Sequence, residues 1–258
     1  RSPSDWFGDN PFFLGAPLNY HFAADLLSGL LHRVGVEWVD AFVIPSILSS
    51  LGLLLALYLV YVTVLRSGGQ TFTAVTLFFL NGGLGFLILL PELVRSGELE
   101  TLFYPAQPVT DRPDQGIHWI SIITSQLFPQ RAVLLGLPVA LLFVWGLQGW
   151  YQRRFEGVPV WKAAIFGLAS AALYFLHVHS WLALAALCGV FFLFSPRRIG
   201  HWAAMLGGAA LPAAAIFYLF YHGAGGSGFF EWYPGWLANP QENGKLNLIE
   251  LWIVNWGL

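Results

Sequence analysis

Long apolar runs alternate with short polar breaks along most of the chain. Apolar segments cover about residues 40–65, 71–90, 131–150, 160–176, 180–194 and 201–221, and a further one begins near residue 247. Several of these segments approach the roughly 20 residues that a helix needs to cross a bilayer. The pattern therefore predicts an all-α polytopic membrane protein with about six to seven transmembrane helices.

The region before the first apolar segment is too polar to cross a membrane, but its second half has helical periodicity. One face carries Phe22, Leu26, Leu27, Leu30, Leu31 and Val34, and another carries a polar stripe of His21, Asp25, Ser28 and His32. We expect an amphipathic helix that either lies along the outer membrane interface or packs its apolar face on the bundle. The polar stripe is either a solvated face or, through His21 and Asp25, the lining of a cavity.

The chain is predicted to form a single membrane domain over residues 1–258. Residues 1–39 make an extracytoplasmic loop with the interfacial helix, and residues 40–258 make the transmembrane bundle. The chain begins at Arg1 with the polar sequence RSPS and ends at NWGL inside an apolar run. We interpret it as a piece of a longer protein, truncated within the bundle at its C-terminus.

Two histidines interrupt the apolar sequence between residues 160 and 194, in the stretch YFLHVHSWLAL. Because histidine is costly in lipid, we expect the HVHS sequence to form the tip of a tight helical hairpin at the membrane surface. One long, broken helix is the alternative. His177 and His179 are then either an acid–base or ligand pair, or two histidines hydrogen-bonded to neighbouring loops.

Composition supports the membrane assignment and excludes other classes. Hydrophobic residues make up 57% of the chain and charged residues only 10%, with a mean hydropathy of +0.63, whereas soluble domains carry about 25% charged residues. The net charge of -2 and the lack of a basic cluster give no indication of nucleic-acid binding. The single Cys188 excludes a disulfide framework and a paired-cysteine zinc site.

The charges divide unequally between the two sides of the predicted bundle. Three short turns on one side contain Arg66, Arg153, Arg154, Lys162, Arg197 and Arg198, and Glu156 is their one acid. The excess of Lys and Arg in short loops marks the cytoplasmic side. The other side, which holds the remaining thirteen acids and every histidine except His201, is therefore predicted to be extracytoplasmic. Any chemistry is expected on that outer face of the cytoplasmic membrane.

An arginine stands at the start of the third apolar segment, in the sequence LFPQRAVLLG. Pro129 favours a helix start here, and the predicted topology points this N-terminus outward. A cation in the first turn opposes the helix dipole unless an anion lies nearby. Gln130 and Arg131 therefore either bind an anion such as a lipid phosphate, or Arg131 forms a salt bridge to an acid of the nearby loop.

The first outer loop supplies the candidate acids. Asp5 and Asp9 lie among glycines and prolines, and His21 with Asp25 form a pair spaced by four residues. Such a pair suits a general base or two ligands of a metal. The sequence has no nucleotide or haem motif, and it leaves open whether a divalent metal takes part.

Several phrases resemble one family of membrane enzymes. NPFFLGAPLNYHFAADLLSGLL, LFPQRAVLLGLPVALL, LHVHSWLAL and IVNWGL look like segments of uncharacterised bacterial proteins of the GT-C superfamily, which are integral-membrane glycosyltransferases. The acids of the first outer loop, the interfacial helix and the short cytoplasmic turns are also similar to that superfamily. The resemblance spreads over most of the chain, but none of its motifs is diagnostic.

The resemblance implies transfer of a sugar from a polyprenyl-phosphate-type lipid donor to an acceptor on the extracytoplasmic face. It implies catalytic roles for Asp5, Asp9, Asp25 and His21, donor-phosphate binding by Arg131 and Gln130, and a cavity lined by Asn19, Tyr20, His177 and His179. In the superfamily the catalytic acid commonly follows a first membrane helix, and in this sequence no such helix precedes Asp5 and Asp9. The expected partners are the lipid-linked donor, membrane lipids and further membrane proteins.

Three other functions compete with this interpretation. The apparent truncation favours a non-catalytic membrane subunit of a larger complex. A transporter would need polar residues along a path through the membrane, and the helices offer only Asn81, Ser46, Ser49, Ser50 and scattered threonines. A zinc-dependent hydrolase would use His21, Asp25, His177 and His179, although no HExxH motif occurs.

Overall fold

The computed structural model describes residues 9–10, 13–17, 23–80, 86–102, 104, 111–112, 117–118, 122–127 and 129–218. They belong to two compact units. One unit combines Arg1–Val75 with Gln130–Phe229, and the other combines Thr76–Pro129 with Phe230–Leu258. The predicted single membrane domain stays a prediction.

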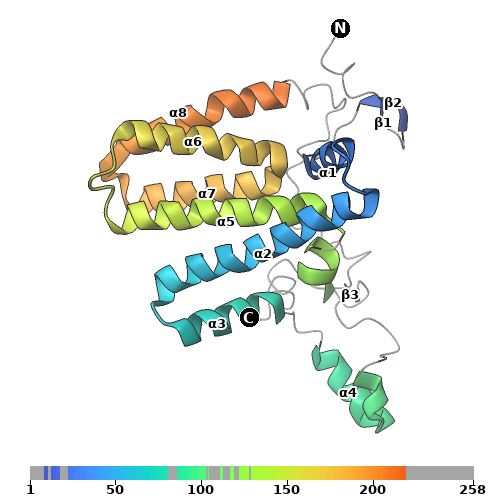
Figure 1. The fold of residues 1–258 in the computed structure, drawn as a ribbon. Coiled ribbons are helices and arrows are strands. Elements are labelled where there is room, and N and C mark those ends of the chain that lie inside the picture. Colours follow the sequence, from blue (N-terminus) through green and yellow to red (C-terminus); the bar gives the residue numbers. More distant parts are fainter. Residues whose placement is uncertain are drawn as a thin grey trace. The chain divides into compact units, whose positions relative to one another are not determined.

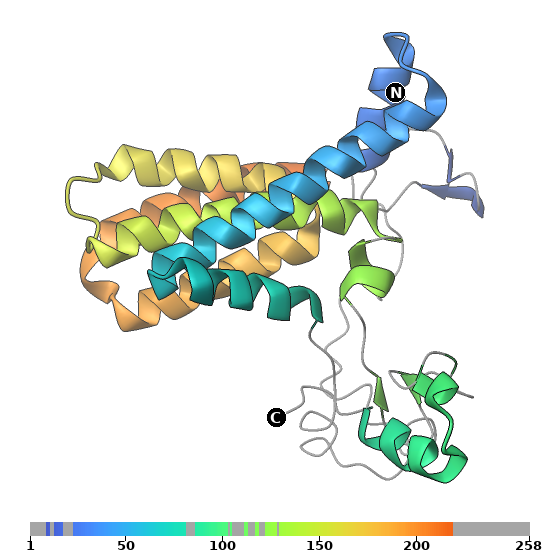
Figure 2. The same ribbon diagram turned by 60° about the horizontal axis from the view of Figure 1, so that its bottom comes forward.

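The first unit is a bundle of helices that lie side by side (Figure 1). Its long helices are α2 (Trp38–Leu65), α5 (Arg131–Gln152), α6 (Val160–Leu176), α7 (Val178–Phe194) and α8 (Ile199–Ile216), and α3 (Gly68–Leu80) begins in this unit. Helix α2 packs on α5, α6 packs on α8, and α7 contacts both α5 and α6. Successive helices run in opposite directions and are joined by short turns, as the predicted topology requires (Figures 1 and 2).

A short strand pair and an amphipathic helix precede this bundle. Strand β1 (Asp9–Asn10) pairs antiparallel with β2 (Phe13–Pro17), with Asp9 opposite Pro17. Helix α1 (Ala23–Arg33) follows and contacts α2, α5 and α6. A turn that contains Gly35 connects it to α2, where Glu37 caps the helix by accepting a hydrogen bond from the N–H of Val39 at 3.2 Å. The amphipathic helix predicted from Tyr20 onward is confirmed over these residues.

The second unit contains α4 (Phe86–Ser96), a 3₁₀ helix (Leu99–Leu102), the antiparallel pair β3 (Asp111–Arg112) and β4 (Ile117–His118), and a π-helix (Ile122–Leu127). Of the apolar segment predicted over 71–90, the structure describes α3 up to Leu80 and α4 from Phe86, and residues 81–85 lie outside the described residues.

Three of the described helices are long and apolar enough to cross a membrane: α2, α5 and α8, with 28, 22 and 18 residues. The apolar helices α3, α6 and α7 are shorter, at 13, 17 and 17 residues. The helical, apolar class predicted from the sequence is thus confirmed, but the described residues supply three spans by this measure and not six to seven. The predicted segment that begins near residue 247 lies outside the described residues.

The predicted hairpin at HVHS is confirmed. Helix α6 ends at Leu176, α7 begins at Val178, and only His177 separates them. The two helices pack against each other along the bundle (Figure 1). One continuous, broken helix is therefore excluded.

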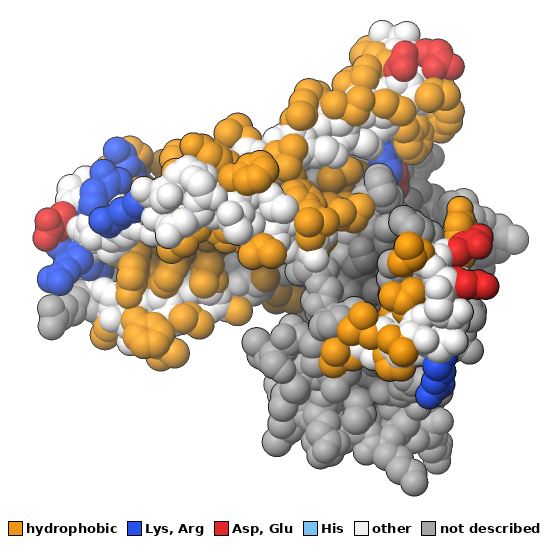
Figure 3. All heavy atoms as spheres, turned by 90° about the horizontal axis from the view of Figure 1, so that it is seen from below, with side chains coloured by type: hydrophobic (Ala, Val, Ile, Leu, Met, Phe, Trp, Pro, Cys, Tyr) orange, Lys and Arg blue, Asp and Glu red, His pale blue; other side chains and the backbone are white. Residues whose placement is uncertain are grey.

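Basic side chains gather at one end of the first unit. The turns that connect α2 with α3, α5 with α6 and α7 with α8 lie together there, and the turn before α8 is bound to the earlier one because Arg198 Nε donates to the carbonyl oxygen of Arg154 at 3.2 Å. We call this the basic end, defined by Arg66, Arg153, Arg154, Lys162 and Arg198; Figure 3 shows such side chains gathered at the end of the bundle. We call the opposite end, with α1 and the turn between α6 and α7, the α1 end.

Helices α6 and α8 approach each other more closely than side chains would allow. A Cβ atom on Gly167 would overlap the carbonyl group of Met205, and a Cβ atom on Gly208 would overlap the carbonyl group of Ala164. Small residues at helix crossings let backbones approach in this way and increase van der Waals contact. Gly208 thus lies at the contact of the two helices, whereas a Cβ atom on Gly207 would meet nothing within 4 Å.

Gly208→Ala is expected to destabilise the protein by about 1–3 kcal/mol, since one added carbon overfills the α6–α8 contact. Gly207→Ala is the matched control, because its Cβ meets nothing within 4 Å. Thermal unfolding followed by tryptophan fluorescence in detergent measures both. Equal midpoints for the two variants would contradict the close α6–α8 contact.

Candidate functional site

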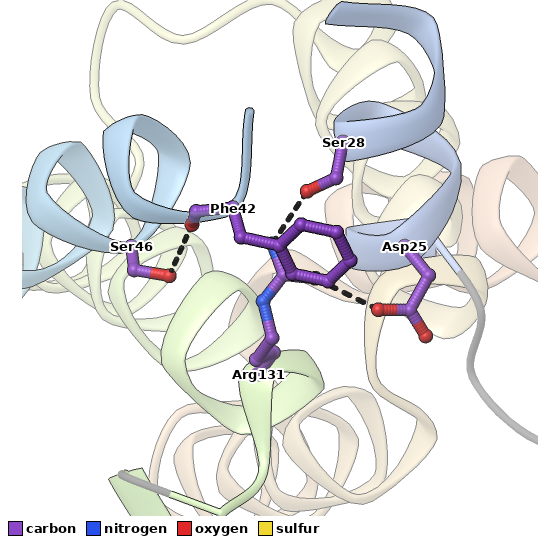
Figure 4. A network of polar contacts seen from close by, with 5 residues as sticks. All are labelled: Asp25, Ser28, Phe42, Ser46 and Arg131. Carbon is purple, nitrogen blue, oxygen red and sulfur yellow. Dashed lines mark hydrogen bonds and ion pairs between the residues drawn. The ribbon is translucent and has the colours of Figure 1, made fainter. Parts of the chain in front are cut away.

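A network around Arg131 connects α1, α2 and α5 at the α1 end (Figure 4). Arg131 Nη1 donates to Asp25 Oδ1 at 2.8 Å, and Nη2 donates to Ser28 Oγ at 2.6 Å. The guanidinium carbon lies 4.4 Å from the centre of the Phe42 ring, a cation–π distance. The Arg131 side chain of α5 is thus held by a carboxylate, a hydroxyl and an aromatic ring. The carboxylate and the hydroxyl come from α1, and the ring comes from α2.

The position of Arg131 follows from local sequence. It is the first residue of α5, after Gln130, which provides no side-chain cap to the helix. The backbone N–H groups of the first turn carry a partial positive charge, so a cation here is unfavourable without a compensating anion. Asp25 provides that anion within the same unit, and the side-chain exposures of 22% for Arg131 and 43% for Asp25 leave the pair only partly screened by solvent.

The spacing on α1 explains how one arginine reaches two partners. Asp25 and Ser28 are three residues apart and therefore share one face of the helix. Ser28 is fully buried, together with Ala23 and Ala24. The polar stripe therefore faces the bundle at Ser28, and the prediction that the whole stripe is solvated is wrong.

The leucines of α1 point the other way. Leu26, Leu27, Leu30 and Val34 are exposed, with Leu30 at 53%. Packing of the apolar face on the bundle, one of the two predicted orientations, is therefore wrong for these residues. In this orientation Asp25 and Ser28 of α1 both contact Arg131.

The space beside Arg131 is small. A cavity of about 10 Å³ is lined by Ala24, Leu27, Pro45, Ser46, Ser49, Arg131, Leu134 and Leu135. This volume is about the minimum for one water molecule. This cavity is therefore too small for a sugar or a phosphate group.

His177 lies between the end of α6 and the start of α7, and its side chain is close to α5. It is buried, and its Nδ1 lies 3.3 Å from the N–H and 2.8 Å from the hydroxyl oxygen of Ser180, so it caps the N-terminus of α7. A Cβ on Gly136 of α5 would overlap the His177 side chain, which shows how closely α5 passes. His179 is exposed, and the centres of the two imidazole rings are 5.3 Å apart. His177 is hydrogen-bonded, as one of the two alternatives expects, although the partner found here is Ser180 of α7 and not a neighbouring loop.

The remaining candidate residues are only partly described. Asp5, Asn19, Tyr20 and His21 lie outside the described residues, and the structure describes only the backbone of Asp9, in β1. Gln130 is exposed at the start of α5. Among the residues described, no group of three or more His, Cys, Asp or Glu side chains could hold a metal ion.

The sequence analysis identified some residues of the Arg131 network and missed others. Arg131 and Asp25 were both candidates, but in separate roles and without mutual contact. Ser28 was noticed only as a member of the polar stripe, and Phe42 not at all, since one phenylalanine in an apolar run gives no signal. The ion pair expected for Arg131 exists, but its partner is Asp25 of α1 and not an acid of the loop before α5.

Comparison with protein-family models, with characterised proteins and with solved structures finds no match to this chain.

The ion pair is expected to couple Asp25 and Arg131 energetically. In a double-mutant cycle of Asp25→Ala and Arg131→Ala, the coupling in unfolding free energy should be about 1 kcal/mol, the upper part of the range for partly exposed pairs. The same cycle with Asp40→Ala, an exposed carboxylate at the start of α2, should give additive effects. Additivity in the Asp25 cycle would show that the contact contributes nothing to stability.

His177→Ala should lower stability by about 1 kcal/mol, because it removes the cap of α7 and leaves a void against α5. His179→Ala, on an exposed side chain, should have a smaller effect. Thermal unfolding midpoints of the two variants test this. A larger loss of stability in the His179 variant would contradict the structural role given to His177.

Proposed function

We propose that the chain is an integral-membrane glycosyltransferase of the GT-C type, which moves a sugar from a polyprenyl-phosphate-type lipid donor to an acceptor on the extracytoplasmic face. We further propose that about six to seven helices cross the cytoplasmic membrane, with the shorter helices α3, α6 and α7 and the segment near residue 247 among them. The observation that carries the proposal is the Arg131–Asp25 pair at the α1 end. It combines an anion-binding group with a carboxylate.

The unequal distribution of Lys and Arg between the two ends of the bundle supports the proposed orientation in the membrane. Lys and Arg in short loops mark the cytoplasmic side, and the basic end collects five such residues. The Arg131–Asp25 pair lies at the other end. Nucleotide sugars are cytoplasmic, so a transferase that acts outside requires a donor carried by a lipid.

The exposed leucines of α1 support contact with that lipid. A helix with one polar and one apolar face lies in the membrane interface with its apolar side in the acyl region. Leu26, Leu30 and Val34 provide this side, while Asp25 and Ser28 face Arg131. The guanidinium would then lie near the depth of the donor's phosphate.

The proposed reaction is a single displacement. The acceptor hydroxyl oxygen attacks the anomeric carbon, the bond from that carbon to the phosphate oxygen breaks, and the polyprenyl phosphate leaves with the electron pair. The proton of the hydroxyl passes to a carboxylate, for which Asp25, Asp5 and Asp9 are the candidates. Arg131, with five N–H donors in a planar fork, stabilises the charge on the leaving phosphate.

A second candidate function is a non-catalytic membrane subunit. The observation that favours it is the small space around the guanidinium, about 10 Å³, together with a charge already neutralised by Asp25. In that case the pair only attaches α1 to the bundle.

Arg131→Ala is expected to lower sugar transfer from a polyprenyl-linked donor at least about 100-fold, the effect of losing one anion-stabilising donor, and Arg131→Lys should be intermediate. Arg33→Ala, in the last turn of α1, is the matched control and should retain turnover. The assay uses the purified chain in liposomes, with thermal unfolding to confirm that each variant is folded. Unchanged turnover in folded Arg131→Ala would remove Arg131 from the mechanism, and no turnover in the unmodified chain would favour the subunit alternative.

A further inference from the structure

An apolar cavity of about 260 Å³ lies between α6, α7 and α8, away from Arg131. Its walls include Gly167 and Ser170 of α6, Ala185 and Gly189 of α7, and Met205 of α8. The one hydroxyl among these five donates to the carbonyl oxygen of Gly167 at 2.7 Å and so is already paired within its helix. A ligand in this cavity therefore needs no polar group.

The shape of the cavity follows the helix axes. Its lining on α7 runs from Trp181 to Gly189 along one face, a distance of about 12 Å at 1.5 Å per residue. The lining residues Trp181 and Trp202 each pack on a further aromatic ring. At one limit Trp181 packs on Tyr174 with ring centres 5.1 Å apart, and at the other Phe192 packs on Trp202 at 6.2 Å.

Small side chains keep the middle of the cavity open. A Cβ on Gly189 would meet nothing within 4 Å, and both Gly189 and Ala185 are exposed. The cavity is larger than the roughly 150 Å³ apolar cavities that bind benzene and stay dry. Because an empty space forfeits dispersion contacts, a flexible hydrocarbon chain parallel to the helices is the occupant that fits.

Cations lie about one helical turn beyond one limit of the cavity. Lys162 precedes the lining residue Phe166 by four residues on α6, and Arg198 precedes the lining residue Trp202 by four residues. Arg154 lies beside Arg198, as the Arg198 Nε hydrogen bond to its carbonyl oxygen shows. Glu156 is the one acid of these turns. The turns at this end of α6 and α8 therefore carry a net positive charge.

We propose that the first unit binds one anionic phospholipid at the basic end, with an acyl chain in the α6–α7–α8 cavity and its phosphate at Arg154, Lys162 and Arg198. The site is separate from the Arg131–Asp25 network and does not depend on sugar transfer. Guanidinium groups bind phosphate oxygens in paired hydrogen bonds. The acyl chain of the lipid fits the shape of the cavity, and its phosphate complements the positive charge of the basic end. Phosphatidylglycerol, which has a net negative charge, should therefore be preferred over zwitterionic phosphatidylcholine.

Native mass spectrometry of the full chain, with equal amounts of dioleoyl phosphatidylglycerol and dioleoyl phosphatidylcholine, tests the proposal. The unmodified protein should retain one phosphatidylglycerol. Gly189→Leu fills the cavity without meeting another atom at its Cβ, and should lower the affinity for phosphatidylglycerol at least about tenfold. Gly207→Leu is the matched control, because its Cβ also meets open space and it lies outside the cavity lining; its retention should be unchanged.

The charge requirement is tested with the triple variant Arg154→Ala, Lys162→Ala and Arg198→Ala, which should bind the two phospholipids equally. Equal retention by Gly189→Leu and Gly207→Leu, or an unchanged preference in the triple variant, would overturn the proposal. Displacement of phosphatidylglycerol by an equal amount of polyprenyl phosphate would also overturn it, since the cavity would then hold the isoprenoid chain.

A photoactivatable phosphatidylglycerol, with a diazirine midway along its acyl chain, gives a test that does not depend on any variant. Cross-links in the unmodified protein should map to α6, α7 and α8 around the cavity. Cross-links confined to other helices would overturn the proposal even where a variant fails to fold.

Discussion

The charge of Arg131 determines how the α1 end is built. The guanidinium lies at the N-terminus of α5, where the backbone already presents partial positive charge, and it is only 22% exposed. Such a group requires an anion within the protein or from a ligand. Asp25 of α1 provides one. Ser28, on the same side of α1, is buried and also accepts a hydrogen bond from Arg131, while Leu26 and Leu30 are exposed.

Helix positions were largely predictable from the sequence, because apolar length and periodicity are local properties. The segments at 131–150, 160–176 and 180–194 agree with α5, α6 and α7 within about two residues. The described parts of the segment at 71–90 are also helical, in α3 up to Leu80 and in α4 from Phe86.

The contacts of the site were less predictable, because they join distant residues. Asp25 and Arg131 are 106 residues apart, and nothing in either local sequence specifies the other. The orientation of α1 was also not deducible: its apolar face is an equally good candidate for a bundle or for a membrane interface, and only the partner of Arg131 distinguishes them. His177 shows a further limit, since a histidine that caps a helix and one that binds a ligand have the same sequence signal.

The ion pair also bears on how a transferase of the proposed kind would begin its reaction. While Asp25 is bound to Arg131, its carboxylate occupies one side of the guanidinium and makes that side less available to other anions. A donor phosphate carries the same sign of charge as Asp25 and competes for the same fork. Exchange of one anion for the other leaves the net charge beside the α5 N-terminus similar, so its electrostatic cost is small. The exchange would release the carboxylate and loosen α1 from Arg131 at the same moment. Donor binding, release of the Asp25 carboxylate and access to the space now limited to about 10 Å³ would then be one coupled event.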